Sequence, residues 1–304
     1  MRIGLGLAAL GRPGYLALGH GVDLGADRSV PALRDRAYGV LDAAYEAGVR
    51  AFDAARSYGR AEEFLGQWLE SRRPGGVTVS SKWGYVYTAD WRVDADPPEV
   101  KRHDAETLRR QLAETRERLG GWLALYQIHS ATPDSGVLED DQVLAELAAL
   151  RADGLAVGVT VSGTSQAETI DRVLQLRLFD AVQATWNLHE RAAEPALVRA
   201  HAAGVGIYVK EALANGRLAG RAPAPELEAA AAAADTTPDA LALAAVLTRP
   251  WADVVLSGAA TVDTLRSNLS ATNVAWSEDL ERRLAPMEED PGAYWARRAE
   301  LVWN

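Results

Sequence analysis

Residues 47–59 read Ala-Gly-Val-Arg-Ala-Phe-Asp-Ala-Ala-Arg-Ser-Tyr-Gly, and this stretch contains the unit from which the fold is built. A helix ends near Gly48, and a short apolar strand follows and stops at Asp53. Tyr58 comes next in a loop, beside Gly59, which permits a sharp backbone turn. We therefore expect a carboxylate held at the end of a strand with a phenol close to it.

The same strand and helix unit recurs along the chain. Short strands rich in β-branched residues are predicted over 3–7, 49–53, 77–81, 123–128, 156–161, 180–184, 205–209 and 254–256. Amphipathic helices are predicted over 33–47, 61–71, 104–119, 138–151, 166–176, 193–203, 238–247 and 262–270. Eight units in 304 residues favour an α/β fold of the closed (β/α)8 TIM barrel type over an open doubly wound sheet. We expect one domain over 1–304, with a C-terminal helix and tail over about 276–304.

Three connecting segments stand out between these units. The Gly-rich segment up to Gly25 is too irregular to predict a helix. The segment between the third strand and His103 is long and aromatic, which makes it a candidate pocket wall. The alanine run 229–234 predicts a surface helix, because alanine has the highest helix propensity.

Composition narrows the class of partner. A formal net charge of −10 argues against nucleic acid or an anionic membrane surface, and favours a small molecule. The absence of cysteine excludes disulfides, thiolate nucleophiles and Cys-ligated metals. The N-terminus has no signal-peptide pattern and no apolar run approaches the ~20 residues of a membrane span, so we expect a cytoplasmic protein.

Four chemically active side chains follow consecutive strands. Asp53 and Tyr58 follow the second strand, Lys82 follows the third and His129 follows the fourth. A lone lysine is usually solvated and a lone histidine is usually structural, but strand ends in a barrel converge on one mouth. An ammonium between the carboxylate and the phenol would favour phenolate. We expect it to lower the pKa of Tyr58 by about 1 to 3 units if it lies within ~6 Å.

At these residues the sequence resembles the aldo-keto reductase family. The matching segments are 52–59, 81–84, 126–129, 158–163, 182–183, 213–216 and 258–259 with Asn268. The resemblance implies an oxidoreductase that needs no metal and transfers hydride between a nicotinamide cofactor and an aldehyde or ketone, or the corresponding alcohol or sugar. It implies Tyr58 as proton donor, Lys82 and Asp53 as its tuning pair, and His129 as the residue that orients the carbonyl.

The resemblance also implies a set of cofactor-binding positions: Thr160, Ser162, Gly163, Gln183, Lys210, Leu213, Asn215, Ser257, Gly258, Arg266 and Asn268. Thr160 and Val161 stand where many members have Ser-Asn. Lys210 stands where many members stack an aromatic ring, and an ion pair with Glu211 is its alternative interpretation.

The choice between the two nicotinamide cofactors depends on the segment after the last strand. The family favours NADP(H), while NAD(H) stays open, because positions 258, 260 and 264 hold Gly, Ala and Thr where members often carry Lys or Arg. Arg266 is the one basic residue there. At helical spacing it faces away from the side shared by Thr264 and Asn268.

Aromatic and amide side chains suggest the walls of a pocket for a flat or sugar-like substrate, with packing alone as the alternative: Tyr15, Trp83, Tyr85, Trp91, Asn187 and Trp295. Family members usually begin with a hairpin that closes the barrel floor, whereas only Met1 and Arg2 precede the first strand here.

Two other functions are open to the same residues. One is a cofactor-binding sensor or regulatory subunit, as the similar potassium-channel β subunits suggest, and turnover of an aldehyde would exclude it. The other is a barrel lyase in which Lys82 forms a Schiff base, which borohydride trapping would reveal.

Overall fold

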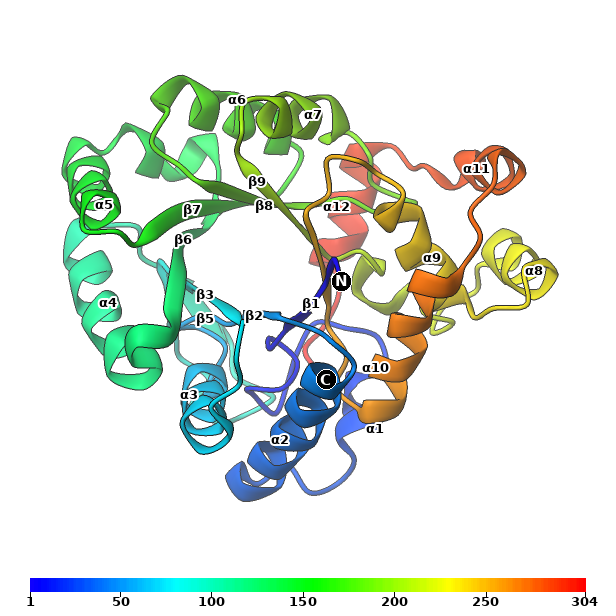
Figure 1. Ribbon diagram of the computed structural model, residues 1–304, viewed down its shortest axis with the longest axis horizontal. Helices are drawn as coiled ribbons and strands as arrows, with labels where there is room; N and C mark the ends of the chain where they lie inside the picture. The colour runs from blue at the N-terminus through cyan, green and yellow to red at the C-terminus, as the bar shows by residue number, and fades with distance from the viewer.

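A computed structural model describes residues 1–304 as a closed barrel of parallel strands surrounded by helices (Figure 1). Around the barrel the strands follow the order β1-β10-β9-β8-β7-β6-β3-β2. The barrel strands are β1 (Ile3–Gly6), β2 (Ala51–Asp53), β3 (Thr78–Trp83), β6 (Leu123–Ala131), β7 (Ala156–Val161), β8 (Ala181–Thr185), β9 (Gly206–Lys210) and β10 (Val254–Ser257). The predicted (β/α)8 barrel is confirmed.

The main helices pack outside the barrel and bury one face against it. They are α2 (Val30–Glu46), α3 (Ala61–Arg72), α4 (Ala105–Leu119), α5 (Asp141–Ala152), α6 (Gln166–Leu176), α7 (Glu194–Ala202), α8 (Pro225–Ala233), α9 (Pro238–Leu247) and α10 (Val262–Leu269). Side chains cap several of them: Asp104 accepts a hydrogen bond from the Thr107 amide of α4 at 2.7 Å. Gly48, with φ of +94°, permits the turn between α2 and β2.

Several segments differ from the sequence expectation. The Gly-rich segment contains a short helix, α1 (His20–Leu24), and the long aromatic segment forms an antiparallel hairpin of β4 (Tyr85–Tyr87) and β5 (Glu99–Lys101). The C-terminal region holds two helices, α11 (Glu278–Leu284) and α12 (Pro291–Ala299). β3 and β6 run further than predicted, so Lys82 and His129 lie in the last residues of their strands.

The predicted alanine-rich surface helix corresponds to α8: most of its residues are exposed, and one face is buried. Leu227, Ala230 and Ala231 pack in a core cluster shared with α9 and α11. No helix alone has the length and apolar composition to cross a membrane; α8 and α9 reach that threshold only when taken together, and they are bent by 85°.

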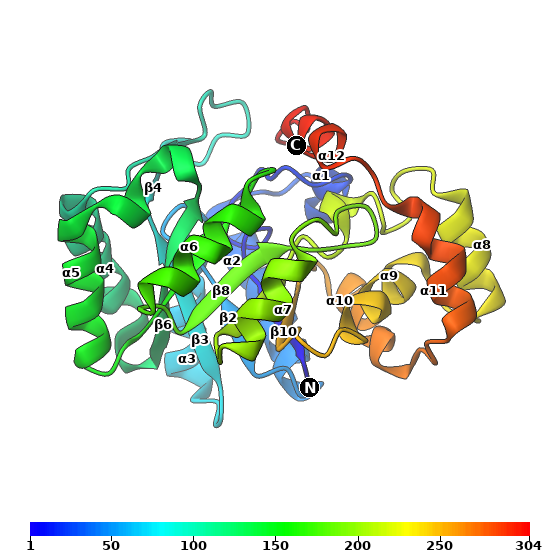
Figure 2. The same ribbon diagram turned by 90° about the horizontal axis from the view of Figure 1, so that it is seen from above.

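The two ends of the barrel carry different parts of the chain (Figure 2). The N-terminus lies at one end, where the Arg2 side chain donates to the carbonyl oxygens of Leu247, the last residue of α9, and of Arg249 and Ala252 just after it. At the opposite end, α12 and the C-terminus lie beside α1. This second end, where the strands finish, carries the site described below.

Candidate active site

Strand register brings the chemically active side chains together on the inner face of the barrel, at successive levels. Asp53 lies opposite Ser80 on β3, and Lys82 lies opposite Gln127 on β6. Because alternate residues of a strand face the same side, Ser80 with Lys82 and Gln127 with His129 point toward the barrel interior.

The Asp53 carboxylate is buried and fully engaged. Its Oδ2 accepts a hydrogen bond from the Lys82 ammonium. Its Oδ1 accepts hydrogen bonds from Ser80 Oγ at 2.6 Å, from Gln127 Nε2 at 3.3 Å and from Gln183 Nε2 at 3.3 Å. These contacts hold the carboxylate in one orientation, as a fixed partner for the lysine.

The Lys82 ammonium links Asp53 to Tyr58. Its Nζ also donates to the Ala54 carbonyl at 2.9 Å and lies 4.7 Å from the centroid of the Tyr58 ring. Burial lowers the pKa of Lys82, although the Asp53 carboxylate opposes that effect. The sequence-predicted trio of carboxylate, ammonium and phenol is therefore assembled.

A close approach of two loops places Tyr58. Gly59 has φ of +60°, and a Cβ there would lie 2.5 Å from the Gly11 carbonyl oxygen. The Arg60 amide donates to the same oxygen at 2.7 Å, so the loops after β1 and β2 are joined. Burial, and then the Asp53 charge, raise the pKa of Tyr58 well above its ordinary value. The predicted lowering of the Tyr58 pKa is therefore wrong, because burial removes the phenol from water and disfavours its charged form.

His129 is a neutral imidazole in this setting. Burial lowers its pKa well below the ordinary value, and the charges of Lys82 and Lys210 add to the effect. Its ring centroid lies 5.5 Å from that of Tyr58 and 4.9 Å from that of Tyr85, and its Nδ1 lies 3.4 Å from Ser57 Oγ. A neutral imidazole can donate one N–H to a carbonyl oxygen.

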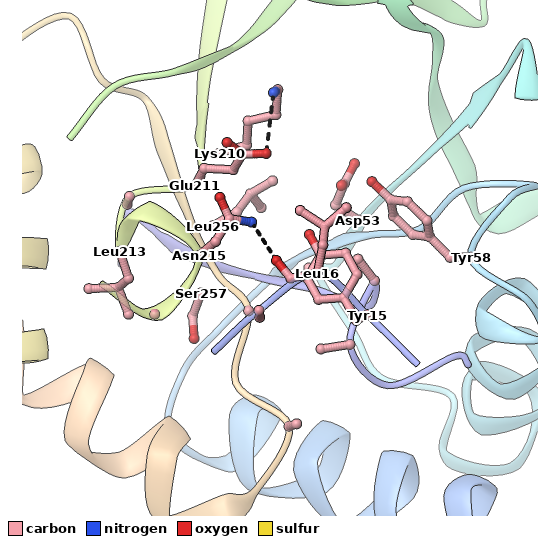
Figure 3. A pocket seen from close by; sticks show the side chains of 18 of the residues that line it. Tyr15, Leu16, Asp53, Tyr58, Lys210, Glu211, Leu213, Asn215, Leu256 and Ser257 are labelled. Atoms are coloured by element: carbon pink, nitrogen blue, oxygen red, sulfur yellow. Dashed lines mark hydrogen bonds and ion pairs between the residues drawn. The ribbon is translucent and has the colours of Figure 1, made fainter. Parts of the chain in front are cut away.

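These side chains open into a cleft of about 340 Å³. Figure 3 shows Asp53 and Tyr58 on one side of the cleft, and Leu213, Asn215 and Ser257 on the other. The lining comes from the ends of the strands and from the loops after them. Of the four predicted catalytic residues, Asp53, Tyr58 and His129 line the cleft, and Lys82 lies directly behind them, 1% exposed.

Most of the predicted cofactor positions line this cleft: Ser162, Gln183, Lys210, Leu213, Asn215, Ser257, Gly258 and Asn268. Thr160, Gly163 and Arg266 do not. Thr160 is buried and its Oγ1 accepts from the Ser130 amide at 2.7 Å, while Gly163 occupies a turn with φ of +85°. The Arg266 side chain is 73% exposed and lies 3.5 Å from Asp263, which confirms that it faces away from Thr264 and Asn268.

Two of the lining residues, Ser257 and Asn268, form side-chain hydrogen bonds within the protein. Ser257 Oγ donates to Asn268 Oδ1 at 2.7 Å, and Asn268 Nδ2 donates to Asp239 Oδ2 at 2.7 Å. Asn268 therefore ties α10 to β10 and α9. Its amide sides are engaged in this structural contact.

The Lys210 side chain is held by polar contacts and presents no aromatic ring for stacking. Its Nζ donates to Ser162 Oγ at 3.1 Å and to Thr185 Oγ1 at 3.0 Å, and lies 3.9 Å from Glu211 Oε1, so the alternative ion pair is present. Burial lowers the pKa of Lys210 to about 8.

Glu211 joins β9 to the C-terminal helix. The Arg298 guanidinium of α12 donates from Nε to both carboxylate oxygens of Glu211, at 3.0 and 2.9 Å. Burial raises the pKa of Glu211, but the charges of Arg298 and Lys210 outweigh it and bring the pKa to about 2. The pair holds α12 at the mouth of the cleft.

The predicted substrate pocket is correct only in part. Tyr15 and Tyr85 line the cleft. Trp83 follows Lys82 on the strand, so strand alternation turns it outward into the core. The indole N–H of Trp91 donates to the Arg28 carbonyl at 2.8 Å, which fixes that ring against the core cluster formed around α2 and α3.

The other two predicted pocket residues are also structural. Asn187 is buried, and its Nδ2 donates to the Glu211 carbonyl at 2.9 Å and to the Tyr294 hydroxyl at 3.0 Å. Trp295 lies on α12 rather than in a tail, and packs with its ring centroid 5.5 Å from that of Tyr294.

Residues that sequence reasoning missed support the site. Ser80 and Gln127 hold Asp53, and each stands two positions before a predicted catalytic residue, so strand alternation could have identified them. Arg12 and Glu99 also line the cleft. Arg12 comes from a loop and Glu99 from a short hairpin, so no periodic pattern in the sequence marks them.

The polar groups that line the cleft fit a nicotinamide dinucleotide. The cleft runs from His129 to Thr264 near the start of α10, where helix N–H groups favour a phosphate. Asn215 Oδ1 is buried without a hydrogen-bond partner in the protein, so this oxygen can accept a hydrogen bond from a bound molecule. No group of three His, Cys, Asp or Glu side chains converges as metal ligands.

Comparison with known proteins gives a consistent family assignment. The model described as Aldo/keto reductase family matches residues 2–285. An aldo-keto reductase from Strobilurus tenacellus is 24% identical over 305 residues, covering 88% of this chain and 86% of the relative.

Solved structures share the fold. A glycerol dehydrogenase from Gluconobacter oxydans superposes with a TM-score of 0.73 at 20% identity, covering 94% of this chain and 90% of that chain. An aldo-keto reductase from Klebsiella pneumoniae in complex with NADPH superposes with a TM-score of 0.67 at 21% identity, with the same coverage of 94% and 90%.

Proposed function

Because this chain belongs to the aldo/keto reductase family, we propose that Tyr58 is the general acid in a hydride transfer between a nicotinamide cofactor and an aldehyde or ketone. The same chemistry in reverse would oxidise the corresponding alcohol or sugar. A bound reduced nicotinamide would supply the hydride to the carbonyl carbon. The protein supplies the proton and holds the carbonyl in place.

Each side chain has a separate task in this proposal. Tyr58 gives its proton to the carbonyl oxygen as that oxygen gains negative charge. Lys82, 4.7 Å from the Tyr58 ring centroid, stabilises the phenolate that is left, and Asp53 keeps the ammonium in place. Neutral His129 donates a hydrogen bond to the same carbonyl oxygen and orients it.

The observation that carries the proposal is the joint placement of Asp53, Tyr58 and His129 on one cleft, with Lys82 behind them. A structural ion pair would need the aspartate and the lysine alone. It gives no reason for a tyrosine and an uncharged imidazole to share the cleft wall with them.

We propose that residues along the rest of the cleft hold the cofactor: Ser162, Gln183, Lys210, Leu213, Asn215, Ser257 and Gly258. No basic side chain of α10 faces the cleft, and Arg221, which also lines it, is paired with Asp23. A 2′-phosphate would therefore depend mainly on backbone donors and Thr264. Both NADPH and NADH should therefore bind, with NADPH favoured.

Tyr58→Phe tests the proposal. It keeps the ring and removes the proton, so reduction of an aldehyde should slow by roughly 10²-fold or more while cofactor affinity is retained. Steady-state kinetics with an aldehyde panel, together with cofactor titration by tryptophan fluorescence, measure the two effects. Turnover near the parent rate in Tyr58→Phe would exclude the general-acid role, and no turnover by the parent protein would favour the sensor alternative.

A further inference from the structure

The Tyr58 ring contacts two buried cations, of which the proposed function uses one. Lys82 Nζ lies 4.7 Å from the ring centroid, and Arg12 Cζ lies 5.1 Å from it. Lys82 comes from β3, whereas Arg12 comes from the loop between β1 and α1. A second buried charge beside the reacting group calls for its own explanation.

Arg12 joins four segments around the tyrosine. Its side chain is 2% exposed, and its Nη1 donates to the Ser57 carbonyl at 3.0 Å and to Glu99 Oε2 at 3.0 Å. Its Cζ also lies 5.0 Å from the Tyr15 ring centroid and 4.3 Å from that of Trp303. The loops after β1 and β2, the β4–β5 hairpin and the C-terminal residues therefore meet at one guanidinium.

We propose that Arg12 is a positioning residue for Tyr58, which fixes the backbone before the tyrosine and stabilises its phenolate as a second cation, while Glu99 limits that effect. The proposal rests on the role of Tyr58 as general acid. The carbonyl of Ser57 belongs to the peptide bond that leads into Tyr58, so the contact at 3.0 Å restrains the tyrosine directly.

The two halves of the ion pair act on Tyr58 in opposite senses. Burial and Asp53 raise the pKa of Tyr58; after them, the charge of Arg12 lowers it and that of Glu99 raises it. The charged and titratable groups that contact Tyr58 or act on it by charge are Arg12, Tyr15, Asp53, Lys82, Glu99, His129 and Glu211. Only Arg12 and Glu99 among them form a pair whose members can be removed singly without touching Asp53 or Lys82.

Alcohol oxidation in the presence of oxidised cofactor gives the test, because the oxidation step needs Tyr58 as phenolate. Below the pKa of Tyr58 the oxidation kcat follows the phenolate fraction, so Arg12→Met should lower it by about tenfold or more. Glu99→Gln keeps the shape of the side chain and removes the charge, and should raise the oxidation kcat a few-fold. Aldehyde reduction, which starts from the protonated phenol, should change less in both variants.

The control is Arg60→Met in the neighbouring loop. Arg60 is 46% exposed and pairs with Glu63 at 3.2 Å, so its loss should leave both directions unchanged. The Arg12 and Glu99 effects should also disappear in a Tyr58→Phe background, where residual oxidation no longer depends on the phenolate.

A purely structural ion pair gives a different pattern. Loss of Glu99 would then lower oxidation and reduction as loss of Arg12 does, and a fall of both rates in Glu99→Gln would overturn the proposal. If Arg12→Met does not fold, the sign of the Glu99→Gln effect decides alone, since a fall in the oxidation kcat contradicts the charge argument. Full activity in Tyr58→Phe would instead remove the general-acid role, which is a separate and distinguishable outcome.

Discussion

Replacement of Glu211 by glutamine should cost the protein a large part of its stability at neutral pH. The Glu211 side chain is 8% exposed and lies between the Arg298 guanidinium and the Lys210 ammonium. Its pKa is about 2 in the fold against an ordinary 4.5, and each pKa unit is worth about 1.4 kcal/mol. Ionised Glu211 therefore contributes roughly 3 kcal/mol, within the range of about 3 to 5 kcal/mol typical of breaking a buried ion pair.

The pH dependence of this loss has a defined sign. Because the pKa of Glu211 is lower in the fold than in the unfolded chain, its stabilisation is complete above pH 4.5 and is lost as the pH falls toward about 2. Glu211→Gln cannot ionise. The difference in the free energy of unfolding between parent and variant should be about 3 kcal/mol at pH 7, and should shrink below pH 4.5.

Urea unfolding of both proteins at several pH values measures the difference. Glu139→Gln is the matched control, because Glu139 pairs with Arg172 at 2.6 Å on the surface, with the two side chains 63% and 35% exposed. That change should cost no more than about 1 kcal/mol. Equal losses in the two variants, or a Glu211 effect independent of pH, would refute the reasoning.

Two further predictions concern the site. Lys82→Met should remove most activity and shift the pH dependence of oxidation upward, because the Tyr58 phenolate loses its nearest cation. Asp53→Asn should act in the same direction but less strongly, since it removes only the partner of the lysine. An unchanged pH profile would contradict this prediction. NADPH should bind more tightly than NADH by no more than about tenfold, or 1.4 kcal/mol, and Arg266→Ala should not change the ratio of the two dissociation constants. A preference for NADPH above a hundredfold that Arg266→Ala abolished would contradict the exposed placement of the Arg266 side chain.

The sequence was sufficient to predict the barrel and the spatial grouping of Asp53, Tyr58, Lys82 and His129, because both depend on strand periodicity and on where strands end. Asp53 and Lys82 could be placed for that reason, and their contact is present. The direction of the Tyr58 pKa could not be predicted, since it depends on how completely loops from distant parts of the chain exclude water. Aromatic composition likewise did not show which rings face the cleft: Trp83 and Trp91 look like pocket residues in sequence, but Trp83 packs in the core and Trp91 packs against it.

The single oxygen Oδ1 of Asp53 receives donors from three strands, through Ser80, Gln127 and Gln183. Loss of one donor leaves two others in place, so a first substitution is partly masked and a second one is felt more strongly than its own single effect. The effect of replacing one of these three residues therefore depends on which of the other two has already been replaced. Related enzymes could therefore exchange these three residues one at a time while the aspartate beneath them stays fixed.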